Sequence, residues 1–409
     1  MVSRPFPQAD ILSWQEARET VLRVVQNQSE AGVVHEQVPL DEAYGRVLAR
    51  DLFADRDYPA LRRSLRDGFA VRSSDLPGRL TVRGETRAGD ISSNLLEAGE
   101  AQEIMTGAPI PDGADAVLMV EHVQRLSGGH AISYERAVES GSFVNEQGSE
   151  ARAGDVLLRT GARLDAAHVA ISASVGLASV PVFPQPSVAI LSTGDELVDV
   201  QQPVRPHLIR NSNSPMLAAL VRAAGGNPIV LPVARDEREH LKTALEEGLQ
   251  ADMLLVSGGV SAGRYDLVKP SLRELGADLH FERVRIQPGG PISFLTRGET
   301  PVFGLPGNPG SSLVTFLLFA RAALQRLGGV PEPELPLFSA RFAAPFQHRP
   351  GLTRFLPAWF DGLAGTVTHI PWQGSSDVPA LARANVFLVA DGDRERWNTG
   401  DLVRVLPKF

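Results

Sequence analysis

The sequence predicts a multidomain protein of the α/β plus β class, in which one domain carries a mostly parallel sheet covered on both faces. Three observations lead to this prediction. The chain has 409 residues, enough for two to four domains at roughly 100–200 residues each. Three apolar runs, within residues 188–197, 251–269 and 300–316, each end in a glycine-rich loop and precede a helix-like segment. On either side of this region, short apolar runs alternate with Gly, Pro and Asp, as in small β-domains.

The N-terminal half is predicted to hold two helices around a β-rich module. Residues 11–25 have helical periodicity, with Ser13 as the N-cap and Glu16 three residues later, which is the arrangement of a capping box. Residues 33–144 contain short apolar runs separated by turn residues, which indicates short strands. A glycine-rich connector follows, and a second helix is expected over residues 166–174.

The three apolar runs are expected to be parallel strands, because uninterrupted apolar strands bounded by helices are typical of sheets with two buried faces. The carboxyl ends of such strands meet at one edge of the sheet, and ligands bind there. Beyond a proline-rich linker at residues 331–336, residues 338–409 return to short strands and are predicted to form a small β-module.

Composition excludes several classes of function. Lys and Arg number 40 against 48 Asp and Glu, so the net charge is −8 and a broad basic surface for nucleic acid is absent. The chain has no cysteine, which excludes disulfides, thiolate nucleophiles and Cys-ligated metals. The nine histidines lack metal-ligand spacing, and His168 and His240 are interpreted as helix-surface residues. With no signal-peptide pattern and no apolar run of membrane length, we expect a cytoplasmic protein that binds neither nucleic acid nor membrane.

The loop SGGVSAG follows the second apolar run. Gly258 and Gly259, directly after a strand, let the backbone turn sharply and present N–H groups to a phosphate, while Ser257 and Ser261 add hydroxyls. The spacing, with the third glycine at Gly263, matches neither a Walker A loop nor a dinucleotide fingerprint. An ordinary strand-to-helix turn is the alternative, and the two comparable loops in the same sheet favour anion binding.

The loop STGDE, after the first run, places Asp195 and Glu196 next to each other beside Thr193 and Gly194. Two adjacent carboxylates at a strand end can hold Mg²⁺ or orient a water molecule. The residues alone support equally the alternative that one of them caps the turn. Asp266, near the next helix start in the second unit, either faces the same cleft or favours the helix dipole.

Two further segments frame the predicted edge. The loop LPGNP is stiffened by two prolines, which suits a binding edge, although Pro309 is also explained as the first residue of a helix. In the segment HLIRNSNSPML, Ser214 is predicted as an N-cap and Pro215 as the first helical residue. That interpretation leaves Asn211 and Asn213 unexplained.

Five strings, in this order along the chain, resemble the molybdopterin molybdenumtransferase family, which includes the C-terminal domain of gephyrin. They are IMTGAPIPDGADAV, STGDEL, IRNSNSPML, SGGVSAGRYD and GLPGNP. Each string is weak alone, but together they have family-like intervals, and the resemblance runs over nearly the whole chain. The resemblance implies transfer of molybdenum from molybdate to adenylylated molybdopterin, with release of AMP in a Mg²⁺-dependent step. It also implies a homodimer and contact with other molybdenum cofactor synthesis proteins.

The resemblance further implies four segments, among them a three-layer α/β domain and a C-terminal β-barrel. On this chain they are an N-terminal helix and connecting domain at residues 7–45 and 144–183, a β-rich domain at 46–143, a three-layer molybdopterin-binding domain at 184–330, and the barrel at 331–409.

Site residues follow from the resemblance position by position. It places Asp195, Glu196 and Asp266 at the Mg²⁺ and hydrolytic centre, and it adds Asp236 as a catalytic carboxylate. It implies that the remaining matching positions bind substrate: Thr193, Gly194, Gly258, Gly259, Ser261, Gly263, Arg283, Pro306, Gly307, Asn308, Pro309, Thr106, Asp67 and Ser375. Of these, Asp67 and Thr106 would come from the β-rich domain of a partner subunit. A divalent cation would let the carboxylates share a site with an anionic substrate.

The chain departs from the family pattern in two places. A family run like DNSAMDGYA is RRSLRDGFA here, so Arg62 and Arg63 replace an acid and an amide. The family's KPGKP is QPGGP, so Gln287 and Gly290 replace two lysines that would normally face an oxyanion. Arg62, Arg63 and Arg285 are candidates to restore that positive charge. The alternative function is a paralogue that binds molybdopterin or a protein partner as a scaffold without inserting metal, and a third is the transfer of tungstate.

Overall fold

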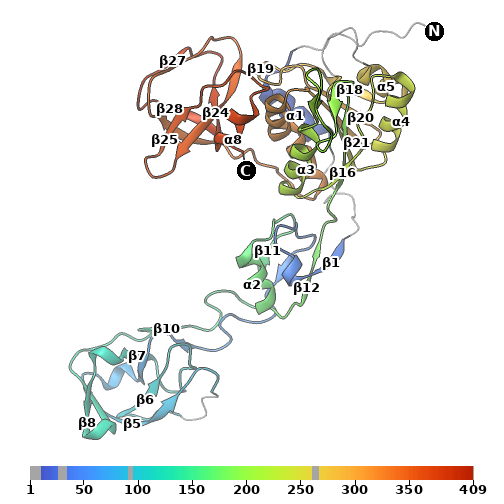
Figure 1. The fold of residues 1–409 in the computed structure, drawn as a ribbon. Helices are drawn as coiled ribbons and strands as arrows, with labels where there is room; N and C mark the ends of the chain where they lie inside the picture. Colours follow the sequence, from blue (N-terminus) through green and yellow to red (C-terminus); the bar gives the residue numbers. More distant parts are fainter. Residues whose placement is uncertain (1–10, 26–34, 91–94, 260–266, 409) are drawn as a thin grey trace. The chain divides into compact units, whose positions relative to one another are not determined.

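The computed structural model describes residues 11–25, 35–90, 95–259 and 267–408, which form two compact units (Figure 1). One unit consists of Met1–Ala49, Gly161–Leu164 and Pro181–Phe409, and the other consists of Arg50–Thr160 and Asp165–Val180. Each unit is therefore assembled from segments that are far apart in the sequence. Within the described ranges, no helix has the length and apolar character needed to cross a bilayer.

The smaller unit is β-rich, as predicted. Its six-stranded sheet has the order β7-β4-β6-β5-β9-β8, in which β5 and β6 are parallel and the other neighbours are antiparallel. Ala70 of β4 belongs to one apolar cluster, and its neighbours Phe69 and Val71 belong to another, so β4 is buried on both faces. The strands are β4 (Gly68–Val71), β5 (Gly78–Thr86), β6 (Glu100–Ile104), β7 (Ala116–Met119), β8 (Gln124–Leu126) and β9 (Ala131–Tyr134).

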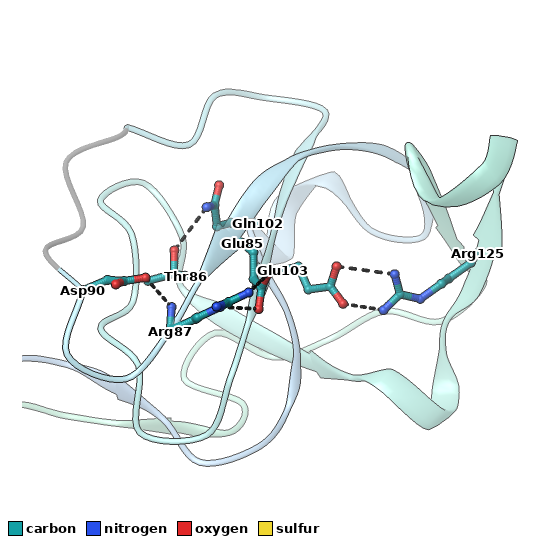
Figure 2. Close-up of polar contacts among 7 residues, drawn as sticks. All are labelled: Glu85, Thr86, Arg87, Asp90, Gln102, Glu103 and Arg125. Atoms are coloured by element: carbon teal, nitrogen blue, oxygen red, sulfur yellow. Dashed lines mark hydrogen bonds and ion pairs between the residues drawn. The ribbon is translucent and has the colours of Figure 1, made fainter.

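Polar side chains pair across this sheet (Figure 2). Glu103 and Arg125 form an ion pair, and the Arg125 guanidinium also lies 5.0 Å from the ring centroid of Phe69. The Gln102 amide donates to the Thr86 hydroxyl at 3.1 Å, and both side chains are buried. Exposed ion pairs contribute only about 0.2–1 kcal/mol each. The buried hydrogen bond between Gln102 and Thr86 matters for a different reason. Either polar group would be destabilising if it were buried without a partner.

The rest of the smaller unit consists of short strand pairs and one helix. β2 (Leu52–Phe53) pairs with β11 (Val156–Leu158), and β3 (Arg63–Ser64) pairs with β10 (Val144–Asn145). Helix α2 spans Ala166–Ser174, which confirms the prediction for these residues. Asp165 is its N-cap and forms a capping box with His168, which lies at the surface as expected.

The larger unit contains the predicted parallel sheet, with the strand order β16-β13-β17-β21-β20-β18. The first four strands are parallel, β20 pairs antiparallel with β21, and β18 pairs antiparallel with β20. The three apolar runs therefore become adjacent strands, with Ser192 opposite Ser257 and Ser257 opposite Leu305. The strands are β13 (Ser187–Ser192), β16 (Asn227–Val230), β17 (Met253–Ser257), β18 (Asp278–Phe281), β20 (Ser293–Arg297) and β21 (Thr300–Leu305).

Helices cover both faces of this sheet, which confirms the three-layer prediction. Because side chains alternate along a strand, Val188 and Ile190 of β13 pack into one apolar core and Ala189 and Leu191 into the other. The first core includes helices α1 (Trp14–Val24), α3 (Asn213–Ala223), α6 (Pro309–Thr315) and α7 (Arg321–Leu327), and the second includes α4 (Arg238–Gly248) and α5 (Val268–Glu274).

The N-terminal helix α1 begins as predicted, because Ser13 accepts from the Glu16 N–H and the Glu16 carboxylate accepts from the Ser13 N–H. A buried arginine on this helix, Arg18, packs against the π-helical turn Phe316–Ala320 that separates α6 from α7. Its guanidinium donates to the carbonyl of Leu318 at 3.0 Å and to the carbonyl of Pro333. Burial lowers the pKa of Arg18 to about 10, so it stays protonated at neutral pH.

The C-terminal residues form a closed five-stranded barrel, which confirms the predicted β-barrel. The barrel closes because β24 pairs with both β25 and β26, while β22 and β28 complete the circuit. Its strands are β22 (Phe338–Phe342), β24 (Thr353–Asp361), β25 (Thr366–His369), β26 (Val386–Ala390) and β28 (Leu402–Pro407), and helix α8 spans Val378–Arg383. Shorter strand pairs are β14 (Leu197–Val198) with β15 (Ile209–Arg210), β19 (Ile286–Gln287) with β24, and β23 (Phe346–Gln347) with β27 (Arg396–Trp397).

Candidate functional site

A cleft of about 730 Å³ opens at the carboxyl edge of the parallel strands, where the sequence predicts a ligand site. The loops that follow β13, β17 and β21 all contribute to its walls. Its lining includes these predicted binding or catalytic residues: Thr193, Gly194, Glu196, Asp236, Gly258, Gly259, Pro306, Gly307, Asn308 and Pro309. It also includes Ser257, whose hydroxyl the sequence analysis singled out.

The two glycines after β17 are required by close packing between the loops. Gly258 has φ +96°, and a Cβ there would lie 2.6 Å from the carbonyl oxygen of Thr193. Gly259 has φ +63°, and a Cβ there would lie 2.9 Å from the Thr193 hydroxyl. The Gly258 N–H already donates to the carbonyl of Leu305 at 3.1 Å, so it is not free for a phosphate. Within the described residues, the Gly259 N–H makes no hydrogen bond and is the donor that this loop leaves open.

The capping prediction for Ser214 is wrong. Helix α3 begins at Asn213, so Ser214 is its second residue and Pro215 its third. The Asn211 side chain takes the capping role instead, because its Oδ1 accepts from the Ser214 N–H at 3.1 Å. The Ser214 hydroxyl makes two other contacts. It lies 2.9 Å from the Ser192 hydroxyl at the end of β13, and it accepts a hydrogen bond from the Asn211 amide at 2.9 Å. A contact from a distant strand therefore decides which residue caps this helix.

Asn213, the second unexplained asparagine, bridges two strand-end loops. Its amide nitrogen donates to the Ser257 hydroxyl and to the Gly307 carbonyl oxygen, each at 2.7 Å. A carbonyl oxygen only accepts, so the atom that faces Gly307 must be the nitrogen. This orientation leaves Asn213 Oδ1 buried and, in the described part of the chain, without a partner. Thr193 also lies in the cleft wall. Its hydroxyl is buried and has no hydrogen-bond partner in the described part of the chain.

Two carboxylates, Glu196 and Asp236, line the cleft, and Asp195 lies close to Asp236. The Asp195 carboxylate accepts from the Asp236 N–H at 3.3 Å, and the Glu196 carboxylate lies over Gly194. Partial burial raises the pKa of Asp236, and the charges of Asp195 and Glu196 raise it further. The structure therefore places Asp236 close enough to Asp195 and Glu196 for their charges to act on it. A divalent cation beside these carboxylates would relieve their mutual repulsion.

The third predicted metal ligand, Asp266, lies outside the described residues, as do Ser261 and Gly263. Among the residues that are described, no group of three His, Asp or Glu side chains is arranged to hold a metal ion. Of the three predicted metal ligands, the described residues therefore include Asp195 and Glu196.

The loop LPGNP forms the opposite wall, and Pro309 is the first residue of α6, as predicted. The Asn308 amide donates to the Ser375 hydroxyl at 2.9 Å, and the Gly310 N–H donates to the Ser375 carbonyl at 2.7 Å. Ser375 therefore lies behind this wall and joins the loop to the C-terminal segment, while its neighbour Ser376 lines the cleft.

Other predicted residues are not among the described residues that line this cleft. Arg283 is exposed between β18 and β19 and is not part of the described lining. Asp67 and Thr106 belong to the β-rich unit. There the Asp67 carboxylate accepts from the Thr106 N–H at 2.6 Å and from its hydroxyl at 2.8 Å. These hydrogen bonds hold the pKa of Asp67 below its usual range.

The candidates for restoring positive charge also lie elsewhere. The Arg62 guanidinium donates to the Ala114 carbonyl at 3.0 Å within the β-rich unit, and Arg63 lines a separate hollow beside Thr106. Neither Arg285, Gln287 nor Gly290 is among the described residues that line the cleft.

Sequence reasoning missed part of the wall between β15 and α3. Ile209 and Arg210 line the cleft together with Asn211 and Asn213. The sequence did contain a signal for this part of the wall. Helix capping did not explain Asn211 and Asn213, and these two residues could have marked the whole segment as part of the site.

The fold and the cleft define a multidomain α/β protein with a cleft at the carboxyl edge of the parallel strands of a mixed sheet, followed by a closed β-barrel. Three family models match the chain: the MoeA N-terminal region (domain I and II) at residues 12–176, a probable molybdopterin binding domain at 189–326, and the MoeA C-terminal region (domain IV) at 339–408. Together these matches span most of the sequence.

Relatives and solved structures agree with these matches. The molybdopterin molybdenumtransferase of Bacillus subtilis is 36% identical over 383 residues, covering 91% of this chain and 89% of the relative. Gephyrin from Dictyostelium discoideum is 31% identical over 425 residues, covering 91% of this chain and 59% of the relative. The crystal structure of the molybdopterin biosynthesis MoeA protein from Pyrococcus horikoshii has a TM-score of 0.79 and 29% identity, covering 97% of this chain and all of that one. The chain belongs to the molybdopterin molybdenumtransferase family.

Proposed function

We propose that the protein is a molybdenumtransferase of molybdenum cofactor biosynthesis, which inserts molybdenum from molybdate into adenylylated molybdopterin and releases AMP with the help of Mg²⁺. The observation that supports this proposal most strongly is the cluster of Asp195, Glu196 and Asp236 at a cleft built from three strand-end loops. With a divalent cation between the carboxylates and the ligand, such a site suits a substrate that carries both phosphate groups and a metal oxyanion.

Carboxylates are ligands of the kind that Mg²⁺ takes, and a cation bound by Asp195 and Glu196 would relieve their repulsion of Asp236, which together with burial raises its pKa. Asp195 and Glu196 are the proposed ligands, together with Asp266. When bound, Mg²⁺ would neutralise charge on the phosphate oxygens as AMP leaves.

The chain's own residues have the following proposed roles. Water attacks the phosphorus atom of the adenylyl group, the bond from this phosphorus to the pterin-side phosphate oxygen breaks, and Asp236 accepts the proton of the water. The Gly259 N–H and the Thr193 hydroxyl bind phosphate oxygens, and the stiff loop Pro306–Pro309 limits access of other water molecules. Arg283 and Ser375 are retained as substrate-binding positions because they match the family pattern.

The complete site is proposed to need a second subunit, whose Asp67 and Thr106 would face the substrate. Their mutual hydrogen bonds keep the Asp67 carboxylate ionised and fixed in direction. A homodimer therefore forms part of this proposal, as does the four-domain division at residues 7–45 with 144–183, 46–143, 184–330 and 331–409. Contact with other molybdenum cofactor synthesis proteins belongs to it as well. Equal activity in a verified monomer would contradict the two-subunit site.

A second candidate function is a scaffold that binds molybdopterin or a protein partner without inserting metal. It is favoured by Gln287 and Gly290, which stand where the family has two lysines. A third candidate is the transfer of tungstate instead of molybdate, because the two oxyanions are nearly alike.

One experiment separates these functions. Purified protein is incubated with adenylyl-molybdopterin, Mg²⁺ and molybdate, and both AMP and metal-loaded pterin are measured. The transferase forms both products, and Asp236→Asn abolishes them without loss of pterin binding. Tight pterin binding with no AMP from the unaltered chain would instead establish the scaffold. Replacing molybdate by tungstate in the same assay measures the preference for the oxyanion.

A further inference from the structure

The lining of the cleft contains both negative and positive side chains. Glu196 and Asp236 are its carboxylates. Among the described lining residues, Arg210 is the one cationic side chain. Its guanidinium forms no ion pair with any described carboxylate, so its hydrogen-bond donors are available to a ligand.

The backbone around Arg210 is fixed although its side chain is exposed. Strand β15 pairs with β14 so that Arg210 lies opposite Val198. The Ile209 N–H donates to the Glu196 carbonyl at 2.9 Å, and the Asn211 N–H donates to the Val198 carbonyl at 2.9 Å. Hydrogen bonds therefore hold both neighbours of Arg210 in place.

Side chains on the C-terminal side add a second anchor. Asn211 is tied to Ser214 and Ser192, and Asn213 is tied to Ser257 and Gly307. An arginine whose backbone is held on both sides loses less freedom on binding than one in an open loop. The segment thus presents a charged group to the cleft from a rigid base.

We infer that Arg210 binds a tetrahedral oxyanion of the substrate, which is either a phosphate of the adenylylated pterin or molybdate itself. This inference rests on the proposed function for the identity of the substrate and adds a binding residue to it. The planar guanidinium fork matches the oxygen spacing of such anions and can donate two parallel hydrogen bonds. Arg210 is also the one positive side chain among the described residues that line the cleft.

The test uses Arg210→Gln, which removes the charge, and Arg210→Lys, which keeps the charge but loses the fork. Arg205→Gln is the matched control, because Arg205 is exposed on the same segment and is not part of the described cleft lining. Each full-length protein is titrated calorimetrically with AMP and, separately, with sodium molybdate in the presence of Mg²⁺. Circular dichroism and thermal unfolding establish that each variant is folded.

Arg210→Gln is expected to weaken binding of at least one anion roughly tenfold, because a single charge-assisted hydrogen-bonded contact at an exposed site is lost. Arg210→Lys should weaken it less, and Arg205→Gln should leave it unchanged. A loss confined to AMP identifies the phosphate as the bound group, and a loss confined to molybdate identifies the metal oxyanion. A loss for both identifies a position that the two anions share.

Three results would overturn the inference: equal affinity of Arg210→Gln and the unaltered chain for both anions, an equal loss in Arg205→Gln, or no binding of either anion by the unaltered chain. Failure of the unaltered protein to release AMP from adenylyl-molybdopterin would refute the proposed transferase activity instead. The titration is independent of turnover, so the two failures can be told apart.

Discussion

Replacing Asn213 by aspartate is expected to destabilise the larger unit strongly while leaving its shape unchanged. The two side chains have nearly the same volume, so no cavity forms. At neutral pH the introduced carboxylate cannot donate to the Gly307 carbonyl or the Ser257 hydroxyl, which the Asn213 amide reaches at 2.7 Å each. It would be a buried, uncompensated charge in contact with a carbonyl oxygen. Such a group costs about 3–5 kcal/mol of the free energy of unfolding.

The stability of the Asn213→Asp variant is expected to fall as the pH rises, and the reason is the pKa of the introduced carboxyl group. Burial and the facing carbonyl raise the pKa of the introduced carboxyl group in the folded state above its unfolded value of about 3.9. Below that value the group is protonated in both states, and its hydroxyl can donate to Gly307. As pH rises toward the folded pKa, the variant should lose stability relative to the unaltered chain by about 1.4 kcal/mol per pH unit. Above the folded pKa the loss is constant.

The assay is urea unfolding between pH 4 and 8, followed by tryptophan fluorescence, because Trp14 is buried in the core of this unit. Asn227→Asp is the matched control, since Asn227 is exposed on the edge strand β16. Its effect should stay below about 0.5 kcal/mol at every pH. If Asn213→Asp unfolds at the same urea concentration as the unaltered chain at pH 7, the assignment of Asn213 as a buried donor between two loops is wrong.

Three further predictions test other parts of the structure. Arg18→Met should lower the free energy of unfolding by about 1–3 kcal/mol in thermal or urea unfolding, because the buried Leu318 carbonyl loses its donor, whereas Arg23→Met on the exposed side of α1 should have little effect. Without metal, Asp236→Asn should raise the melting temperature at neutral pH, since the raised pKa of Asp236 means that its charge is destabilising above pH about 4; a lower melting temperature would contradict this. Ser13→Ala should cost about 1 kcal/mol through loss of the capping box, and hydrogen exchange in the first turn of α1 should increase; unchanged exchange would show that the box is dispensable.

Local chemistry determined much of the fold from the sequence. The capping box of Ser13 and Glu16 and the proline at the start of α6 act within a few residues, so their patterns predicted helix starts correctly. The three apolar runs predicted parallel strands. The central strands of a sheet that is covered on both faces bury both of their sides and are therefore continuously apolar. Alignment of their carboxyl ends then followed from strand direction alone, and it predicted where the cleft would lie.

Only the tertiary structure decided the details that depend on partners far away in the chain. Ser214 matched the pattern of an N-cap, yet Ser192 of β13 engages its hydroxyl and Asn211 takes over the capping. The sequence predicted the Gly258 N–H as a phosphate donor. In the folded chain this N–H donates to the carbonyl of Leu305 in β21 instead.

Arg210 looked like any exposed arginine, because nothing in its neighbourhood along the chain shows that β14 fixes it at the wall of the cleft. Sequence patterns record preferences that act over a few residues. The competition for each hydrogen bond and the surroundings of each charge are settled only when distant segments pack together.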